Sequence, residues 1–340
     1  MKKKVLGCLC ILLATALVLG FAQALLQPKY MTSAREGALI AEYYNETDRS
    51  HDVLFVGDCE VYESFTPPTL WEEYGVTSYV RGSAQQLAWH SYYLLEEMLQ
   101  YETPKVVVYN VLALKYGEPQ SEAYNRLNLD GMRLSASKLR AIRASMTEEE
   151  SFASYLFPLL RFHSRWKELS AEDFEYLFYR DRVSHNGYLM QTEIRGGTSD
   201  ITPVPLTDPS LPKTSMEYLE KMRLLCEEKG VAFVLIKAPT NDWKYHWYDE
   251  WDEQISAYSE AHDLHYYNFI PLCEEIGIDW STDTYDGGTH LNVWGAEKLT
   301  SYFGEILVTE LGLKGHHGDA ELSAVWAEKL ENYLAERDRK

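Results

Sequence analysis

The sequence predicts an α/β protein with a doubly wound, mainly parallel sheet, a helical insertion and an N-terminal transmembrane helix. Short apolar runs recur along the chain, and stretches with a helical spacing of apolar residues lie between them. Strands buried on both faces read as continuous apolar runs, and their alternation with helices is typical of a parallel sheet covered by helices. With 340 residues, 46% of them hydrophobic, the chain is long enough to bury a large core.

The N-terminal segment predicts a membrane anchor, with a cleaved signal peptide as the alternative. Lys2, Lys3 and Lys4 precede Val5–Leu26, an apolar run of 22 residues without a charge. About 20 such residues span the hydrocarbon core of a bilayer, and flanking lysines stay in the cytoplasm. We therefore expect a single-pass anchor at 1–27 and an extracytoplasmic domain at the cell membrane. The Ala22-Gln23-Ala24 site resembles a signal-peptidase site, and cleavage there would give a secreted protein.

The folded part is expected to begin after a juxtamembrane segment at 28–50, with a helix from Thr32 to Ser50. A single α/β domain then covers 51–340. Its first strands are expected at Val53–Gly57, Ser78–Gly82 and Lys105–Leu112, with helices at Pro68–Tyr74 and Gln86–Tyr101. The strands are short and apolar, and the helices stop near glycine or proline.

The alternation stops at about residue 116 and resumes after residue 212. The stretch 116–212 holds helical segments such as Glu148–Glu168 and loops such as Gly196–Pro205, so we interpret it as a helical insertion over one end of the sheet. The elements expected after it are helix Ser215–Lys229, strand Val231–Ile236, helix Tyr248–His262, strand His265–Ile270, helix Val293–Leu311 and helix Ala320–Arg337.

Charge argues against one class of partner. The formal net charge is −20, with acidic residues spread along the whole chain. So negative a surface repels phosphate backbones, and nucleic-acid binding is not expected. The sequence has no CxxC or HExxH pattern, no histidine pair in a metal motif and no glycine-rich phosphate loop, so neither a metal nor a nucleotide cofactor is implied.

Three of the five cysteines lie outside the apolar N-terminal run: Cys59, Cys226 and Cys273. An odd number in an exported chain indicates a free thiol. Cys226 and Cys273 either pair with each other or are two inert buried thiols.

Polar residues collect where the predicted strands end. Gly57-Asp58-Cys59-Glu60 follows the first strand, Gly82 ends the second and Asn110 lies near the end of the third. The loop Asp286–His290 opens a late helix. Ligands of open α/β sheets bind outside the carboxyl ends of the strands, so these groups are expected along one edge.

These blocks resemble the SGNH (GDSL-like) hydrolase superfamily, over roughly Asp52 to Leu311 without the insertion. The resemblance implies a flavodoxin-like fold. It matches Cys59 to the nucleophile position, Gly82 and Asn110 to oxyanion donors, and His290 to the late D-x-x-H pair. The stretch Asp286–Thr300 is similar to envelope-associated members, such as the D-alanyl-transfer protein of teichoic acid modification. Such members often act beside membrane-bound O-acyltransferases on cell-surface polymers.

The chain departs from the family pattern at two positions. Cys59 replaces serine, and Asp286 lies four residues before His290 rather than three, because of the Gly287-Gly288 pair. Asp283 is then a second candidate for the acidic partner. A thiol beside a histidine still suits acyl chemistry, because its thiolate attacks a carbonyl carbon to give a thioester. The roles expected are Cys59 as nucleophile, His290 as base and acid, and the aspartate as the group that orients the imidazole.

Each site residue also has a structural alternative. Cys59 could be a small core residue, His290 a helix cap, Asn110 a strand-end partner and Gly82 a turn glycine. Further candidates for substrate binding are Asp58, Glu60, Lys237 and His185, for which ordinary turn or packing roles are the alternative. The aromatic stretch Trp243–Trp251 could stack on sugars or pack inside the domain.

The leading hypothesis is therefore an exported SGNH-type esterase or acyltransferase acting on acyl groups of a cell-envelope polysaccharide or other acylated glycopolymer. A non-catalytic scaffold of the same fold, which binds glycan or a membrane-bound O-acyltransferase, is the alternative.

Overall fold

The computed structural model describes residues 2–28, 37–47, 49–179, 182–197, 207–241 and 247–339. Within them, five parallel strands form one sheet in the order β2-β1-β3-β4-β5. The strands are β1 (Val53–Gly57), β2 (Ser78–Gly82), β3 (Val106–Asn110), β4 (Ala232–Lys237) and β5 (His265–Asn268). The predicted α/β class with a parallel sheet is confirmed, and this strand order is the flavodoxin-like one.

Side chains of the central strands alternate between two apolar cores. In β1, Val53 and Phe55 belong to one core, whereas Leu54 and Val56 belong to the other. Successive side chains of a strand point to opposite faces, so a strand covered on both sides must be apolar throughout. This is why the run Val53–Gly57 reads as a block rather than as an alternating pattern.

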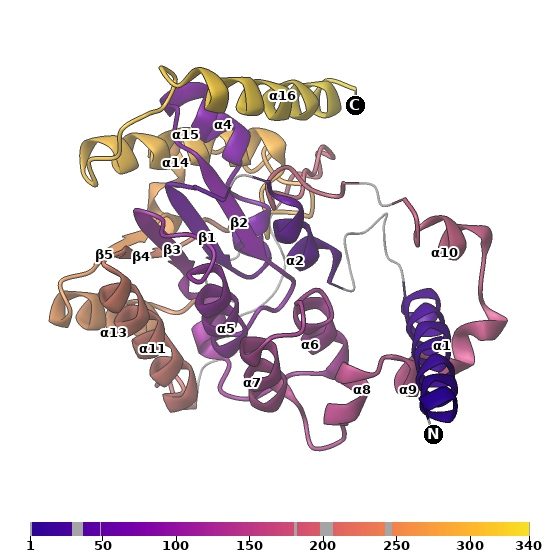
Figure 1. Cartoon of the computed structure of the whole chain (residues 1–340). Coiled ribbons are helices and arrows are strands. Elements are labelled where there is room, and N and C mark those ends of the chain that lie inside the picture. Colours follow the sequence, from indigo (N-terminus) through magenta and orange to yellow (C-terminus); the bar gives the residue numbers. More distant parts are fainter. Residues whose placement is uncertain are drawn as a thin grey trace.

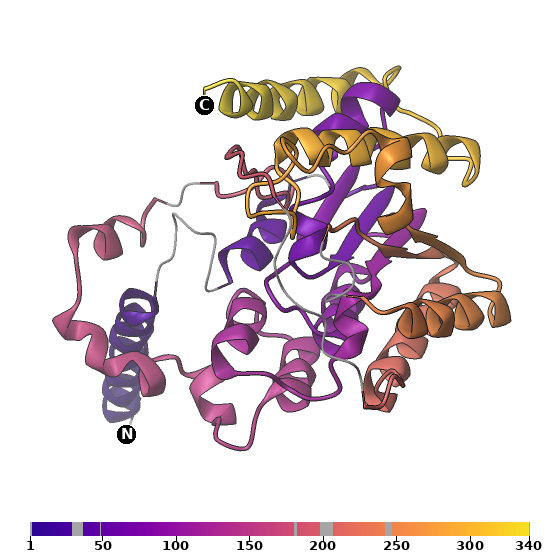
Figure 2. The same cartoon turned by 180° about the vertical axis from the view of Figure 1, so that it is seen from behind.

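Helices cover both faces of the sheet, which makes it doubly wound (Figures 1 and 2). One face carries α4 (Pro67–Tyr74), α14 (Cys273–Ile276), α15 (Val293–Thr309) and α16 (Ala320–Arg337). The other carries α5 (Ala88–Met98), α11 (Lys213–Lys229) and α13 (Asp249–Ala261). Apart from the short α14, which was not expected, these helices agree with the expected ones to within a few residues at each end.

The insertion follows η3 (Val111–Lys115) and is more broken than expected. It contains α6 (Glu122–Leu129), α7 (Ala136–Ser145), α8 (Phe152–Leu156), α9 (Leu159–Phe162), η4 (His163–Lys167) and α10 (Ala171–Glu175). The helical stretch predicted at Glu148–Glu168 is interrupted before Pro158, where Phe157 has φ −125° and ψ 78°. The ring of a proline disfavours the helical conformation of the residue before it, and this explains the break. Much of the loop predicted at Gly196–Pro205 lies outside the described residues.

The N-terminal region agrees with the prediction in part. α1 (Lys2–Leu26) has a mean hydropathy of 2.6 and is long and apolar enough to cross a membrane, a test that a signal sequence also passes. Of the helix predicted from Thr32 to Ser50, the described residues form only the short α2 (Ala38–Glu42) and η2 (Tyr43–Asn45). Residues 29–36 and 48 lie outside the described part.

Cysteine pairing is settled by the structure. Cys226 is buried in α11, Cys273 is partly buried at the start of α14, and both are free thiols. The possible Cys226–Cys273 disulfide is therefore wrong, and Cys59 is one of several free thiols.

Candidate active site

Cys59 lies at the point of the sheet where a ligand site is expected. β1 is flanked by β2 and β3: β2 is added on one side of β1, and β3, β4 and β5 follow on the other, so the strand order reverses between β1 and β3. In doubly wound sheets, ligands bind in the crevice at this switch point, beyond the carboxyl ends of the strands. Asp58 follows β1 and caps the short helix α3 (Cys59–Tyr62), its carboxylate accepting a bond from the Glu60 N–H. Cys59 is therefore the first helical residue after the strand, and it is partly exposed.

Cys59, His290 and Asp286 form a hydrogen-bonded line. The Cys59 Sγ lies 3.0 Å from His290 Nε2, and Asp286 Oδ2 lies 2.6 Å from His290 Nδ1. Asp286 Oδ1 also accepts the backbone N–H groups of Thr289 and His290 at 3.1 and 2.9 Å, which fixes the carboxylate. A thiol, an imidazole and a carboxylate are thus in contact, and this geometry is compatible with covalent catalysis by a cysteine.

The structure decides between the two candidate acids. Asp283 is 2% exposed, and its Oδ2 accepts the Lys298 ammonium at 2.6 Å and the Asp279 N–H at 2.8 Å. Asp286 is the carboxylate that contacts the imidazole. The helix-cap alternative for His290 is also wrong, because Asn292 caps α15, its side chain accepting the Gly295 N–H.

The double glycine absorbs the extra residue between Asp286 and His290. Gly287 and Gly288 both have positive φ, +89° and +102°, which glycine adopts without steric cost. A Cβ on Gly288 would lie 2.8 Å from the Cβ of Asn241. The Gly288 carbonyl accepts the Asn241 N–H at 2.8 Å and the Thr240 hydroxyl at 3.2 Å, so the loop after β4 holds the loop that carries His290.

Glu63 and Tyr285 stand beside the imidazole, and the sequence interpretation missed both. Glu63 Oε2 lies 3.8 Å from His290 Nδ1, and the Tyr285 hydroxyl donates to the Glu63 carboxylate at 3.0 Å. The Tyr285 ring is stacked on that of His290, with centroids 6.0 Å apart. Glu63 comes four residues after Cys59, a spacing that brings two side chains to one side of a helical turn and offered a usable signal.

The ionisation of the pair is set by burial and by the acids around it. Burial raises the pKa of the Cys59 thiol, and His290 opposes this rise. Burial alone would lower the pKa of His290, but the thiolate form of Cys59, the bond to Asp286 and the charge of Glu63 hold that pKa well above 6.5. The titrations of the thiol and the imidazole are therefore coupled, and one proton is shared across the 3.0 Å contact between Cys59 Sγ and His290 Nε2.

Comparisons with known proteins add little to this geometry. No protein-family model matches the chain, and no curated protein matches it. Among solved structures, the chain is similar to the crystal structure of a "putative acylhydrolase" from Bacteroides fragilis. The identity is 10%, the match covers 80% of this chain and 95% of that chain, and the TM-score is 0.39. A likeness this distant carries no argument about chemistry, which must come from the residues themselves.

Asn110 does not meet the requirement for an oxyanion donor. Its side chain is fully buried, and its amide Nδ2 donates to Asp58 Oδ1 at 3.1 Å and to Glu60 Oε2 at 3.0 Å. Its Oδ1 accepts the Ala238 N–H at 3.0 Å. Both amide protons are engaged, so the alternative of a strand-end partner fits this residue better.

Two backbone amides remain as candidate oxyanion donors, those of Gly82 and Cys59. Gly82 pairs in register with Gly57, and a Cβ at Gly82 would approach the Tyr62 ring at 3.1 Å and the Gly57 carbonyl at 3.0 Å. Glycine at this position therefore also serves packing. The Cys59 N–H belongs to the first turn of α3, and no hydrogen bond among the described residues uses it. Amides of this kind are the usual donors of an oxyanion hole.

Three of the candidates for substrate binding form a buried layer beneath the thiol. The Lys237 ammonium contacts both Glu60 carboxylate oxygens at 2.8 Å and the Ala238 carbonyl at 2.7 Å, and the two charged side chains are 0% and 4% exposed. Burial and the charge of Glu60 raise the pKa of Asp58 to about 7. Lys237 binds Glu60, and Asp58 and Glu60 both accept the Asn110 amide. These contacts favour support of the turn over contact with a substrate.

His185 lies elsewhere in the molecule. Its Nε2 is 3.0 Å from Glu336 on α16, and its ring meets Tyr333 edge-on with centroids 5.3 Å apart. The bridge between His185 and Tyr188 closes a turn at the edge of β2, where Val80 N–H bonds to Asn186. These contacts favour the turn alternative for His185 over substrate binding.

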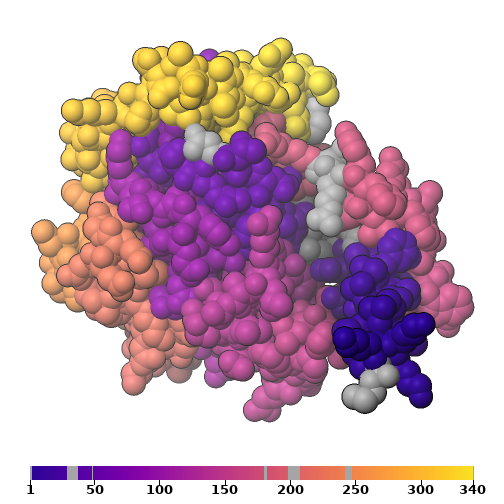
Figure 3. Space-filling view, in the orientation of Figure 1, coloured from indigo at the N-terminus to yellow at the C-terminus, as the bar shows by residue number. Residues whose placement is uncertain are grey.

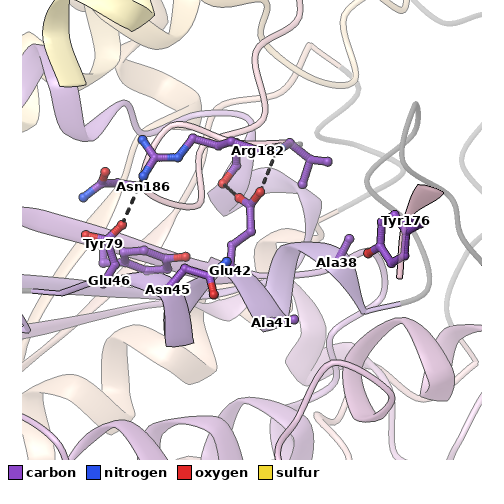
Figure 4. Close-up of a pocket in the computed structure, with 11 residues that line it drawn as sticks. Ala38, Ala41, Glu42, Asn45, Glu46, Tyr79, Tyr176, Arg182 and Asn186 are labelled. Atoms are coloured by element: carbon purple, nitrogen blue, oxygen red, sulfur yellow. Dashed lines mark hydrogen bonds and ion pairs between the residues drawn. The ribbon is translucent and has the colours of Figure 1, made fainter. Parts of the chain in front are cut away.

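A cavity of about 140 Å³ lies beside this turn, and Cys59, His290 and Asp286 do not line it (Figure 4). The charged groups that line it have partners within the protein: Glu42 accepts the Ser184 hydroxyl and the Val183 N–H, and Arg182 lies 3.6 Å from Glu46. The cavity marks the junction between α2 and the end of the insertion. Over the described residues, no group of three or more metal-ligating side chains occurs.

The aromatic stretch Trp243–Trp251 is described only from Trp247 onward. Trp247 is 2% and Trp251 7% exposed, and their rings pack with centroids 5.6 Å apart. These two rings belong to the core beneath α13, so they are not available for stacking on a sugar.

Proposed function

We propose that the chain is an SGNH-type esterase or acyltransferase that works through Cys59, His290 and Asp286. The observation that carries the proposal is the 3.0 Å contact between Cys59 Sγ and His290 Nε2, with Asp286 on the opposite ring nitrogen. The side chains of His290 and Asp286 are 18% and 26% exposed, so a substrate can reach them from solvent.

The first half-reaction forms an acyl-enzyme. The Cys59 sulfur attacks the carbonyl carbon of an ester and passes its proton to His290 Nε2. The carbonyl oxygen becomes an oxyanion, for which the N–H groups of Cys59 and Gly82 are the proposed donors. As the C–O bond breaks, the imidazolium returns the proton to the departing alkoxide, which leaves as an alcohol. The acyl group stays on the Cys59 sulfur as a thioester.

The second half-reaction releases the acyl group. His290 removes a proton from water or from the hydroxyl of a sugar, and the resulting oxygen attacks the thioester carbonyl. The C–S bond breaks, and the sulfur takes back the proton from the imidazolium. Water gives hydrolysis and a sugar hydroxyl gives transfer. Thioesters react readily with other acceptors, so the cysteine suits both outcomes.

We further propose that α1 is retained as an anchor and that the acyl groups belong to a cell-envelope glycopolymer. The family resemblance and the apolar helix support this assignment. A formal charge of −20 favours a neutral acylated polysaccharide over a polyphosphate. A membrane-bound O-acyltransferase is the partner that this chemistry would suit, since it would supply or receive acyl groups at the membrane.

The test is capture of the acyl-enzyme on the full-length protein. With p-nitrophenyl acetate, mass spectrometry should find one acetyl group on the peptide that contains Cys59, and nitrophenol release should fall by at least about 10³-fold in Cys59→Ala. Cys273→Ala, which removes another partly buried free thiol, should behave as the wild type. Unchanged turnover in Cys59→Ala would refute the catalytic assignment.

The alternative of a non-catalytic scaffold has an observation in its favour. Burial raises the pKa of the Cys59 thiol, and Asn110 is not free to bind an oxyanion. Iodoacetamide labelling across pH separates the two functions. In an active centre, His290→Ala should raise the apparent pKa of Cys59 alkylation, because His290 lowers that pKa. A scaffold would leave Cys59 unlabelled in both proteins.

A further inference from the structure

Half of the exposed large apolar side chains outside α1 lie in one short segment of the insertion. Among the described residues, twelve such side chains occur beyond α1, and six of them fall within residues 157–179. The six, with their exposed fractions, are Phe157 (59%), Leu160 (59%), Trp166 (65%), Phe174 (46%), Phe178 (86%) and Tyr179 (66%). Soluble domains rarely collect so many on one stretch, and such patches mark interaction sites.

This segment surrounds one end of α1. Residues 2–21 of α1 are exposed, whereas Leu25 and Leu26 are only 8% exposed, so the contacts are made at the C-terminal end of the helix. α9, η4 and α10 make them, and the Arg165 guanidinium donates to the Leu26 carbonyl at 2.9 Å. In both cartoon views α1 runs beside α9 and α10 at the periphery, apart from the sheet (Figures 1 and 2). The space-filling view shows the indigo atoms of α1 next to the pink atoms of the insertion (Figure 3).

The position of this contact relative to the bilayer follows from the length of α1. A hydrocarbon core of about 30 Å takes about 20 helical residues at 1.5 Å each. Counted from Val5, directly after the lysines, the apolar core ends near Ala24. Leu25, Leu26 and the bonded Arg165 then lie at the outer boundary between lipid tails and headgroups. This is the level at which membrane proteins place Trp and Tyr.

The composition of the segment fits this level. Residues 157–167 carry Arg161, Arg165 and Lys167 and no acidic residue, in a chain of net charge −20. The Lys167 ammonium lies 5.5 Å from the centre of the Trp166 ring. Glu168, Glu172 and Glu175 follow in the chain, so attraction to anionic lipid is not the main contribution. The main contribution to membrane binding is burial of aromatic and aliphatic side chains in the interface.

We propose that residues 157–179 form an interfacial membrane-binding surface. This surface packs against the outer end of α1 and inserts its aromatic side chains among the lipid headgroups of a bilayer. The proposal goes beyond acyl chemistry and rests on the retention of α1. It gives the insertion a function: it fixes the catalytic domain against the membrane instead of leaving it on a free tether.

The test uses full-length protein, with α1 verified by intact mass, in phosphatidylcholine nanodiscs with and without brominated acyl chains. α1 contains neither Trp nor Tyr, so bromine quenching reports only on other parts of the chain. Trp166 should be quenched in the wild type, and Trp166→Phe should lose that quenching. Trp326→Phe, which removes a ring buried against Trp71 beneath α16, should keep it.

A gain of signal makes the test independent of Trp166 itself. In the Trp166→Phe background, Phe178→Trp should restore quenching, whereas Val325→Trp on α16 should not. No bromine quenching in the wild type, or equal quenching in Trp166→Phe, overturns the proposal. The first of these results, no quenching of the wild type in discs without a partner, would favour coverage of the aromatic surface by a partner protein.

Discussion

Glu63→Gln should remove a pH-dependent loss of stability that originates beside the candidate active site. The Glu63 side chain is 5% exposed, and it lies 3.8 Å from His290 and 3.0 Å from the Tyr285 hydroxyl. Burial raises its pKa from 4.5 to about 7, even though His290 and the bond from Tyr285 lower it. Glutamine has the same shape and cannot ionise, so the substitution isolates the charge.

The magnitude follows from the two pKa values. One pKa unit corresponds to about 1.4 kcal/mol, so a rise from 4.5 to about 7 corresponds to roughly 3 kcal/mol. Between pH 4.5 and 7, the native state holds a proton that the unfolded state has released. The free energy of unfolding therefore falls as pH rises through this window. Above pH 7 the full cost of the buried charge is present in the wild type and absent from Glu63→Gln.

The assay is urea unfolding of the full-length protein in detergent at pH 5, 6, 7 and 8, followed by tryptophan fluorescence. α1 has no tryptophan, so the signal reports on the α/β domain. The stability of Glu63→Gln relative to the wild type should increase by about 2.5 kcal/mol from pH 5 to pH 8, because part of the total is already lost at pH 5. Glu149→Gln, at an exposed position between α7 and α8, serves as the matched control. A relative stability that is flat or falls with pH would contradict a native Glu63 whose pKa is raised by burial.

Three further substitutions test the site and its support. Asp286→Asn should lower turnover by about 10²- to 10⁴-fold through loss of the oriented imidazole, whereas Asp283→Asn should keep most of the turnover. Equal losses in steady-state assays would contradict the pairing of Asp286 with His290. Lys237→Met should cost about 3–5 kcal/mol in urea unfolding, because it leaves a buried carboxylate unpaired, whereas the 91% exposed Lys213→Met should cost less than about 1 kcal/mol. Gly288→Ala should lower both the melting temperature and turnover, because φ is +102° and the added Cβ meets the loop after β4; unchanged calorimetry and kinetics would argue against this close approach.

The sheet and the line of polar groups at its edge could be read from the sequence for a simple reason. Strands such as Val53–Gly57 are buried on both faces, so the apolar run and the strand coincide. Parallel strands also align their carboxyl ends, and this brings Cys59 and the loop of His290 to one edge despite their distance along the chain. The local apolar pattern predicted the strands, and the parallel topology predicted that Cys59 and the His290 loop meet.

The rest depended on side-chain partners that are distant in sequence. Asn110 is an amide at a strand end in either interpretation, and only the burial of Glu60 and Asp58 next to it shows that both its protons are used. His185 is committed to Glu336, which lies 151 positions away. The break in the insertion, by contrast, had a signal in the sequence: Pro158 restricts the backbone of the residue before it.

The separation between thiol and imidazole has a consequence for how the protein is made. Cys59 and His290 are 231 positions apart. Ribosomes add about 5–20 residues per second, so the cysteine is synthesised roughly 10–50 s before its base exists. During that interval the sulfur has neither its proton acceptor nor the loop that carries it. The nascent chain therefore carries Cys59 as an ordinary unpaired thiol, and the Cys59–His290–Asp286 line forms only when the segment with the last strand and helices docks.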